Sequence, residues 1–337
     1  MQRRTDFTYT TELEPHRGRT KAILKAHPEV RNLIGRNPYS IFIILFVVSL
    51  QVFVAWLLRD AAWWWVLAAA YLFGAFANHS MFVMIHESCH NLLFKKKSLN
   101  RISAILANLP QSFPSSESFR IYHIKHLSFQ GNHELDTDIP SRWEARLINN
   151  YFIGKVFWLL LYPFFQVART FRVAEVKSYD GWVILNWVVQ FLFDAVIVYF
   201  FGWMSLLYLF LSFFFSIGLH PIGARWIQEH YLVNGNQETY SYYGILNWIQ
   251  MDIGHHNEHH DFPSVPWNNL KKLRQTAHEF YDPLYAHYSW TKLFFRFLFD
   301  REISLYSRLL RKNRGNVPLT DVSVPDRELI SAERSQG

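Results

Sequence analysis

The chain has 337 residues, of which 50% are hydrophobic and 18% are charged. An ordinary soluble domain has about 25% charged residues, so this composition points to lipid surroundings. The formal charge of +7 suits either nucleic acid or an anionic membrane surface. Long apolar segments favour the membrane, and no nucleic-acid partner is expected. The single cysteine, Cys89, excludes an intrachain disulfide and a cysteine-rich metal site.

The first 38 residues carry many basic side chains and no early apolar core, so we expect a cytosolic N-terminal segment at 1–38 and no cleaved signal peptide. Four apolar segments follow, each with the roughly 20 residues that a helix needs to cross a bilayer. They cover residues 39–58, 61–85, 182–201 and 203–222. Short breaks at Arg59-Asp60 and at Gly202 join them into two helical hairpins.

Two shorter apolar stretches lie between the hairpins. Residues 102–113 are too few to span a membrane, which favours an interfacial or re-entrant segment. Residues 151–168 are interrupted by Lys155 and Pro163, and we place them at the membrane surface. We therefore expect one membrane domain over residues 39–312, followed by a polar, disordered tail at 313–337.

The basic residues predict the orientation of these spans. Four spans bring the chain back to its starting side, so residues 1–38, 86–150 and 223–337 share one compartment. Lysine and arginine are dense in the first two of these regions, whereas Arg59 is the only basic residue in either hairpin turn. By the positive-inside rule this compartment is the cytosol. The fold class predicted is an all-α, multi-pass integral membrane protein with four transmembrane helices in two hairpins and a cytosolic, histidine-rich cap.

Three histidine motifs fall on the cytosolic side: HESCH at 86–90, HIKH at 123–126 and HHNEHH at 255–260. A further histidine, His230, lies in the sequence QEHY. Histidines four residues apart share one helical face and can bind a common metal, as expected for the first motif. The third motif offers the same arrangement, with its histidines at 256, 259 and 260 on one face.

The number of histidines indicates two metal ions. Imidazole suits iron, copper, zinc and nickel, but eight candidates exceed what one tetrahedral zinc uses. HESCH also matches the zinc-protease pattern, with Glu87 as general base and His256 or His260 as third ligand. That interpretation leaves the second motif and most of the third without a role. The candidate ligands are His86, His90, His123, His126, His230, His256, His259 and His260.

Longer motifs extend over nearly the whole chain. They include DFTYTTELEPHRGRT near the N-terminus, NHSMFVMIHESCHN at 78–91, ETYSYYG at 238–244 and HNEHHDFPSVP at 256–266. In these motifs the chain resembles the membrane fatty-acid desaturases, and within them the sphingolipid Δ4-desaturases, which act on dihydroceramide. No HPGG-like haem-binding motif is present, so an external electron donor is expected.

The resemblance implies a non-haem di-iron enzyme of the endoplasmic reticulum membrane. Electrons would come from NADH through cytochrome b5 reductase and a separate cytochrome b5. The implied reaction is the O2-dependent conversion of dihydroceramide to ceramide, a trans double bond being formed at carbon 4. Hydroxylation at carbon 4 stays open as an alternative. Carboxylates beside the histidines are candidates to orient them: Glu87, Glu229, Glu258 and Asp261.

The chain departs from the family pattern at two positions. The second motif of the family usually reads HxxHH, whereas Leu127 follows His126 here, and Arg225 stands where relatives often have histidine. Leucine cannot bind a metal. Three explanations compete: a replacement ligand moves in, water fills the position, or the chain is a divergent protein that binds metal weakly and no longer desaturates. The candidate replacements are His133, His255 and Asp136.

Overall fold

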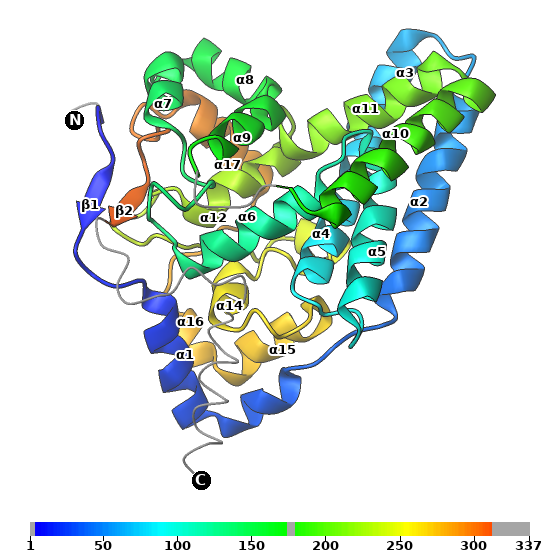
Figure 1. The fold of residues 1–337 in the computed structure, drawn as a ribbon. Coiled ribbons are helices and arrows are strands. Elements are labelled where there is room, and N and C mark those ends of the chain that lie inside the picture. The colour runs from blue at the N-terminus through cyan, green and yellow to red at the C-terminus, as the bar shows by residue number, and fades with distance from the viewer. Residues whose placement is uncertain (1–3, 174–178, 312–337) are drawn as a thin grey trace.

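The computed structural model describes residues 4–173 and 179–311, so the predicted tail at 313–337 lies outside the described residues. Helices dominate the fold (Figure 1). The short strands β1 (Thr8–Thr10) and β2 (Leu309–Arg311) pair in parallel and join the two ends of the described chain. The predicted helical membrane fold is confirmed, with the addition of this small sheet.

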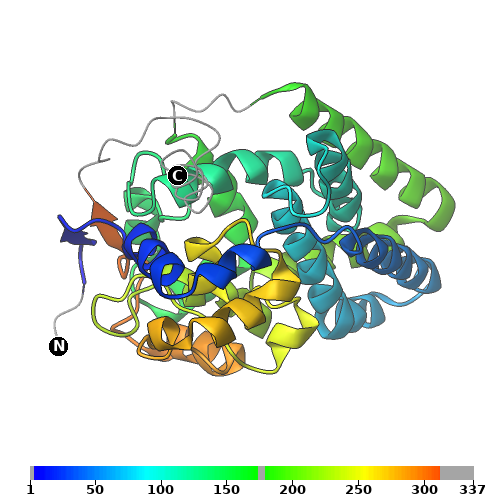
Figure 2. The same ribbon diagram turned by 90° about the horizontal axis from the view of Figure 1, so that it is seen from below.

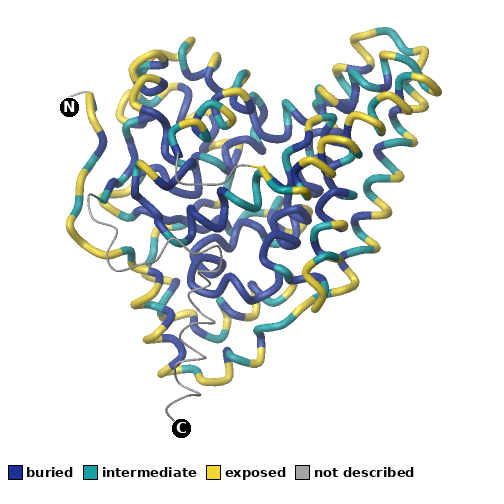
Figure 3. The backbone as a smooth tube through the Cα atoms, viewed as in Figure 1, coloured by how far each residue is buried: buried dark blue, intermediate teal, exposed yellow. Residues whose placement is uncertain are grey.

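A helical bundle forms one arm of the molecule (Figure 1). Its long helices are α2 (Ser40–Leu57), α4 (Ala75–Cys89), α10 (Gly181–Phe201) and α11 (Trp203–Ile217). The short helix α3 (Trp63–Ala69) leads through a π-helical turn into α4. Large apolar side chains on the outer faces of α2 and α10 are exposed, as expected where lipid replaces water (Figure 3).

Four helical stretches of the described residues are long and apolar enough to cross a membrane, which agrees with the four predicted spans. Two of the predictions match α2 and α10 within a residue or two. The predicted span at 61–85 is too short, because the helix continues to Cys89 and carries the first histidine motif with it.

The predicted span at 203–222 is wrong at its end. The regular helix α11 stops at Ile217, and the chain continues through a 3₁₀ turn at Pro221–Ala224 into α12 (Arg225–His230). Pro221 explains the break, because proline has no N–H to donate to the carbonyl of Ile217 four residues earlier. Gly218 is needed for packing: a Cβ atom there would lie 2.4 Å from the carbonyl oxygen of Leu159 on a neighbouring helix.

The two shorter apolar stretches form separate helices. Helix α5 (Lys97–Asn108) packs against α4, α2 and α10. After it the chain turns back through Ser112, which has a left-handed backbone, into α6 (Ser116–Ser128). This path is that of a helical hairpin. The second stretch divides at Leu161 into α8 (Phe152–Leu160) and α9 (Tyr162–Thr170), each of nine residues and too short to span.

A second group of helices surrounds α12. It contains α7 (Arg142–Ile148), α8, α9 and α17 (Trp290–Phe299). Its centre is a buried ion pair between Arg169 and Glu144, and Trp158 donates its indole N–H to the same carboxylate. Both charges and the indole are thereby satisfied away from water, which fixes the register of three helices.

A cap covers the end of the bundle that carries the histidines. It consists of α1 (Pro15–Ala26), α14 (His256–Asp261), α15 (Trp267–Thr276) and α16 (His278–Tyr281). Helix α1 lies across α14 on the lower face (Figure 2). Ile23 and Leu24 of α1 share a small apolar core with Phe262 and Leu273. The N-terminal segment is thus an integral part of the cap. The cap also includes the short helix α13 (Leu246–Ile249), which lies in the loop before α14.

Candidate metal centre

Four helices bring the eight candidate histidines to the junction of bundle and cap. Helix α4 delivers His86 in its last turn and His90 at its C-terminus, and α6 delivers two more histidines. Helix α12 ends at His230, and α14 supplies three. All eight side chains are buried. Burying so many imidazoles is costly unless their ring nitrogens bind something.

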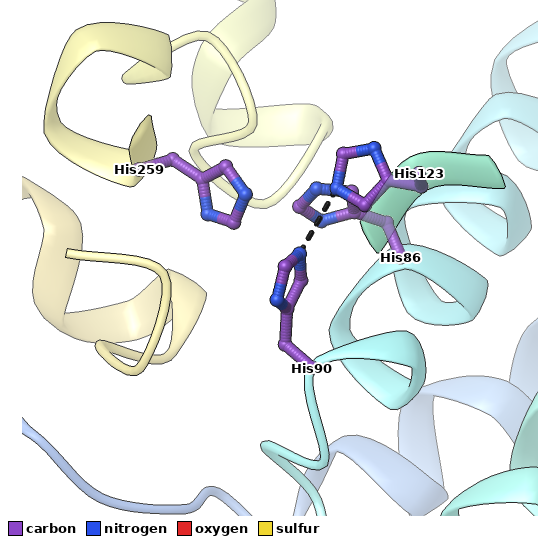
Figure 4. Close-up of side chains that lie close together, drawn as sticks. All are labelled: His86, His90, His123 and His259. Atoms are coloured by element: carbon purple, nitrogen blue, oxygen red, sulfur yellow. Dashed lines mark hydrogen bonds between the residues drawn. The ribbon is translucent and has the colours of Figure 1, made fainter. Parts of the chain in front are cut away.

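The first cluster contains His86, His90, His123 and His259, with one ring nitrogen of each within 4.8 Å of the others. The Nε2 atoms of His90 and His123 are 3.0 Å apart. Figure 4 shows His259 facing the other three rings from the opposite side, so the cluster is enclosed by bundle and cap together. Its geometry depends on how α14 docks on α4 and α6.

The second cluster contains His126, His230, His256 and His260. The Nε2 atom of His230 is 3.0 Å from that of His126 and 3.1 Å from that of His256. One ring nitrogen each of His126, His230 and His260 lies within 4.8 Å of the other two. The ring of His256 is centred 4.4 Å from that of His260. The structure therefore brings together all eight predicted residues, in two sets of four.

Two helices contribute to both clusters. On α14, His259 points to the first cluster, while His256 and His260 point to the second. The three residues lie on one broad face of the helix, as expected, but they divide between the two clusters. Neighbouring residues of an α-helix point about 100° apart, so His259 and His260 diverge. Their ring centroids are 6.0 Å apart, and those of His123 and His126 on α6 are also 6.0 Å apart, which makes the clusters direct neighbours.

The unpaired nitrogen atoms of the clusters fit metal ions. Among the described residues, both ring nitrogens of His259, Nδ1 of His86 and Nε2 of His260 are buried without a hydrogen-bond partner. An unsatisfied buried polar group costs about 1–3 kcal/mol. Two facing Nε2 atoms at 3.0 Å must share a proton or a cation. A bound cation in each cluster would take one nitrogen from each of the surrounding rings.

Burial keeps most of these rings in the neutral form that binds metals. The pKa values of His123, His256, His259 and His260 lie well below the ordinary value, because burial disfavours the charged ring and neighbouring histidines add like charge. Neutral imidazole offers one lone pair to a metal, and no proton has to be removed first.

His126 differs because it has carboxylate partners. Burial lowers its pKa, but the charges of Asp136 and Asp138 outweigh that effect and raise the pKa to about 9. Nδ1 of His126 lies 2.9 Å from a carboxylate oxygen of Asp136, which directs Nε2 into the second cluster. The arrangement is that of a carboxylate–histidine–metal triad.

The structure places the proposed replacements for the missing histidine outside the two clusters. Asp136 orients His126, and its other oxygen accepts the backbone N–H of Gly131. His133 lies beside Glu134 and Arg172, and His255 bonds to Asn247. Leu127 itself is buried.

The four carboxylates expected to orient histidines divide into two kinds. Glu87 and Glu229 lie near a candidate ligand, at 3.9 Å from Nδ1 of His86 and 3.6 Å from Nδ1 of His256. Glu87 also accepts the backbone N–H of Trp267, which ties α4 to the cap. By contrast, Glu258 accepts hydroxyl groups of Ser241 and Tyr243, and Asp261 binds α1, so both hold the cap around α14.

The N-terminal segment contributes a contact that spacing did not reveal. His16 of α1 places Nδ1 at 2.8 Å from Asp261 and Nε2 at 2.9 Å from Thr239. Its ring centroid is 4.7 Å from that of His260 in the second cluster. The signal in the sequence was the motif EPHRGRT, where Arg19 also binds Asp261.

Comparisons with known proteins identify the family of the chain. The family model described as fatty acid desaturase matches residues 62–292, and a model described as sphingolipid Δ4-desaturase matches residues 3–39. A sphingolipid Δ4-desaturase of Drosophila melanogaster is 42% identical over 93% of this chain and 97% of its own length.

Relatives from a plant and from humans are similar over the same region. A protein of Oryza sativa subsp. japonica with a Δ4-desaturase-like name is 44% identical over 91% of this chain and 93% of its own length. A Homo sapiens protein named sphingolipid Δ4-desaturase/C4-monooxygenase is 39% identical over 92% of this chain and 96% of its own length. These relatives match both the bundle and the cap.

Proposed function

Since the chain belongs to the fatty acid desaturase family, we propose that it is a sphingolipid Δ4-desaturase, which converts dihydroceramide to ceramide by an O2-dependent oxidation. The relatives that share about 40% of its residues carry that activity in their names. The lipid substrate fits a protein with four helical stretches that are long and apolar enough to cross a membrane.

The observation that carries the proposal is the pair of adjacent, buried, all-imidazole clusters. Members of this family generally use non-haem iron, which, when bound, supplies the oxidant for an unactivated methylene group. We propose one iron ion in each cluster. The first would be held by His86, His90, His123 and His259, and the second by His126, His230, His256 and His260.

The protein's own residues enclose and orient this centre. Phe119 stacks on the ring of His123 with centroids 4.9 Å apart, and Phe82 packs on Phe119 at 4.9 Å. These rings form an apolar wall on the bundle side, where a lipid tail would approach. Such a wall excludes water from the reacting carbon atoms.

The electron route and the cellular location are part of the same proposal. We propose that a separate cytochrome b5, reduced by NADH through its reductase, docks on the cytosolic side of the endoplasmic reticulum membrane. The basic N-terminal segment packs on the cap beside the second cluster, and the hairpin turns lie at the other end of the bundle (Figure 1). This charge distribution supports cytosolic termini and a cytosolic cap.

A second candidate activity is C4-hydroxylation, because the human relative is named as both a desaturase and a C4-monooxygenase. Lipid analysis of a host that lacks its own sphingolipid desaturase separates the two. Expression of this chain is expected to yield ceramide; phytoceramide would shift the assignment to a hydroxylase. The purified protein is expected to contain two iron ions. An unchanged lipid profile at normal protein levels would contradict both activities.

A further inference from the structure

Arg225, the first residue of α12, is a buried cation beside both clusters, with 3% of its surface exposed. One terminal nitrogen, Nη1, pairs with the carboxylate of Glu229 one helical turn later. The guanidinium carbon lies 4.1 Å from the ring centroid of Trp226 and 4.7 Å from that of Phe82. Aromatic faces thus cover the cation, and water has little access to it.

One edge of this guanidinium has no partner. Nε and Nη2 of Arg225 are buried, and neither has a hydrogen-bond acceptor among residues 4–173 and 179–311. These two N–H groups point in parallel from the same edge of a planar group, the arrangement that binds two oxygen atoms. Leaving both of them unsatisfied in a buried position is unfavourable. A guanidinium has no lone pair to offer, so the edge cannot bind a metal.

The position of Arg225 connects it to both clusters. Phe82, under the guanidinium, lies one turn before His86 on α4 and packs on Phe119, which stacks on His123. Glu229, its ion-pair partner, lies 3.6 Å from His256. The side chain of Arg225 is therefore connected to both clusters through its direct neighbours.

We propose that the Nε/Nη2 edge of Arg225 binds the two oxygen atoms of the sphingoid base next to the reacting bond, namely the hydroxyl on carbon 3 and the amide carbonyl. This inference rests on the function proposed above. Oxidation at carbon 4 brings the carbon-3 hydroxyl to the clusters, since the two carbons are bonded. Arg225 would then be a specificity-determining residue, because a lipid without these oxygens leaves its charged edge buried and unsatisfied.

The test compares two lipids on the iron-loaded protein in nanodiscs: short-chain dihydroceramide and its 3-deoxy analogue. Arg225→Lys keeps a positive charge opposite Glu229 but cannot offer two parallel donors. We expect this variant to bind dihydroceramide about 10-fold or more weakly, since a hydrogen bond to a charged group is worth about 1.5–3 kcal/mol. Binding of the 3-deoxy analogue should change by less than about 2-fold, so the variant should lose the preference for dihydroceramide over this analogue. Its iron content should stay constant.

Arg169→Lys is the matched control. Arg169 is equally buried, but its guanidinium is occupied by Glu144. This variant is expected to unfold at a lower temperature and to keep the preference for dihydroceramide. If Arg225→Lys does not fold, Arg225→Gln, which retains a donor without charge, replaces it in the same comparison.

Two results would overturn the inference. One is an equal loss of affinity for both lipids, or a loss of iron, in Arg225→Lys, which would mean that the side chain supports the metal centre. The other is the absence of any preference in the unaltered protein. Because binding is measured without turnover, a protein that shows the preference but forms no ceramide contradicts the proposed function alone.

Discussion

The two histidine clusters are oriented by different means. In the first cluster, Nδ1 of His86 and both ring nitrogens of His259 have no hydrogen-bond partner among the described residues. In the second, Nδ1 of His126 bonds to Asp136, and Nδ1 of His230 donates to the backbone carbonyl of Glu238. The first cluster depends on helix packing, and the second on hydrogen bonds around its rings. The second is also the one next to Leu127.

The largest expected effect comes from His259→Ala. The imidazole of His259 is the only contribution of the cap to the first cluster as described here, so its loss opens that cluster on one side. Activity should fall by more than about 100-fold, beyond what the loss of an outer partner costs. Iron analysis should show about one ion per chain instead of two. The exposed His278 provides the control, and His278→Ala should match the unaltered protein.

Asp136→Asn is expected to weaken metal binding in the second cluster alone. The change keeps the shape of the side chain but removes the charge that fixes the ring of His126. Loss of such a partner typically costs about 10–100-fold in metal affinity or activity. Chelator titration should therefore release one ion early and leave the other unchanged. Equal weakening of both ions would show that the clusters are not independently held.

Leu127→His restores the residue that the family pattern places in the second motif. If the second cluster is one ligand short, the added imidazole should slow the loss of its iron to a chelator by about 10-fold. Activity should rise or stay constant. Leu127→Met is the control for altered packing at this buried position, and it should leave iron retention unchanged. A normal iron content and full turnover in the unaltered chain would exclude the divergent, inactive alternative.

The smallest effect is expected for Glu87→Gln at the first cluster. The carboxylate is 3.9 Å from Nδ1 of His86, too far for a strong hydrogen bond, and its other oxygen accepts the backbone N–H of Trp267. Glutamine can still accept that bond. Activity should change by less than about 10-fold, below the effect of Asp136→Asn. A larger loss would mean that carboxylate orientation matters equally in both clusters.

Residue type and spacing were enough to identify the eight candidate histidines and the helical membrane fold. The hydrophobic lengths located α2 and α10 well, because such segments are decided locally. The prediction overran the end of α11, although Gly218 and Pro221 directly after it are typical of a helix C-terminus. Periodicity placed the histidines of the third motif on a common face. It could not show how they divide between two clusters, because that depends on how α6 and α14 pack on each other.

The partners around the clusters were harder to foresee. Asp136 was expected as a possible replacement ligand, but it lies ten positions after His126 and contacts Nδ1 of that histidine. The contact of His16 with Asp261 joins residues 245 positions apart, and single-sequence patterns contain no information on such pairs. The unpaired edge of Arg225 becomes visible only when burial and hydrogen bonds are known.

The packing of α1 on α14 sets the order of events during synthesis. The ribosome delivers the N-terminal segment first, yet its partners Asp261 and β2 emerge last. Both clusters contain histidines of α14. Neither cluster can therefore be completed until the four long helices of the bundle, which precede α14 in the chain, have been synthesised. Until then α1 lacks its partner Asp261. Assembly of both clusters is therefore coupled to synthesis of the chain as far as α14.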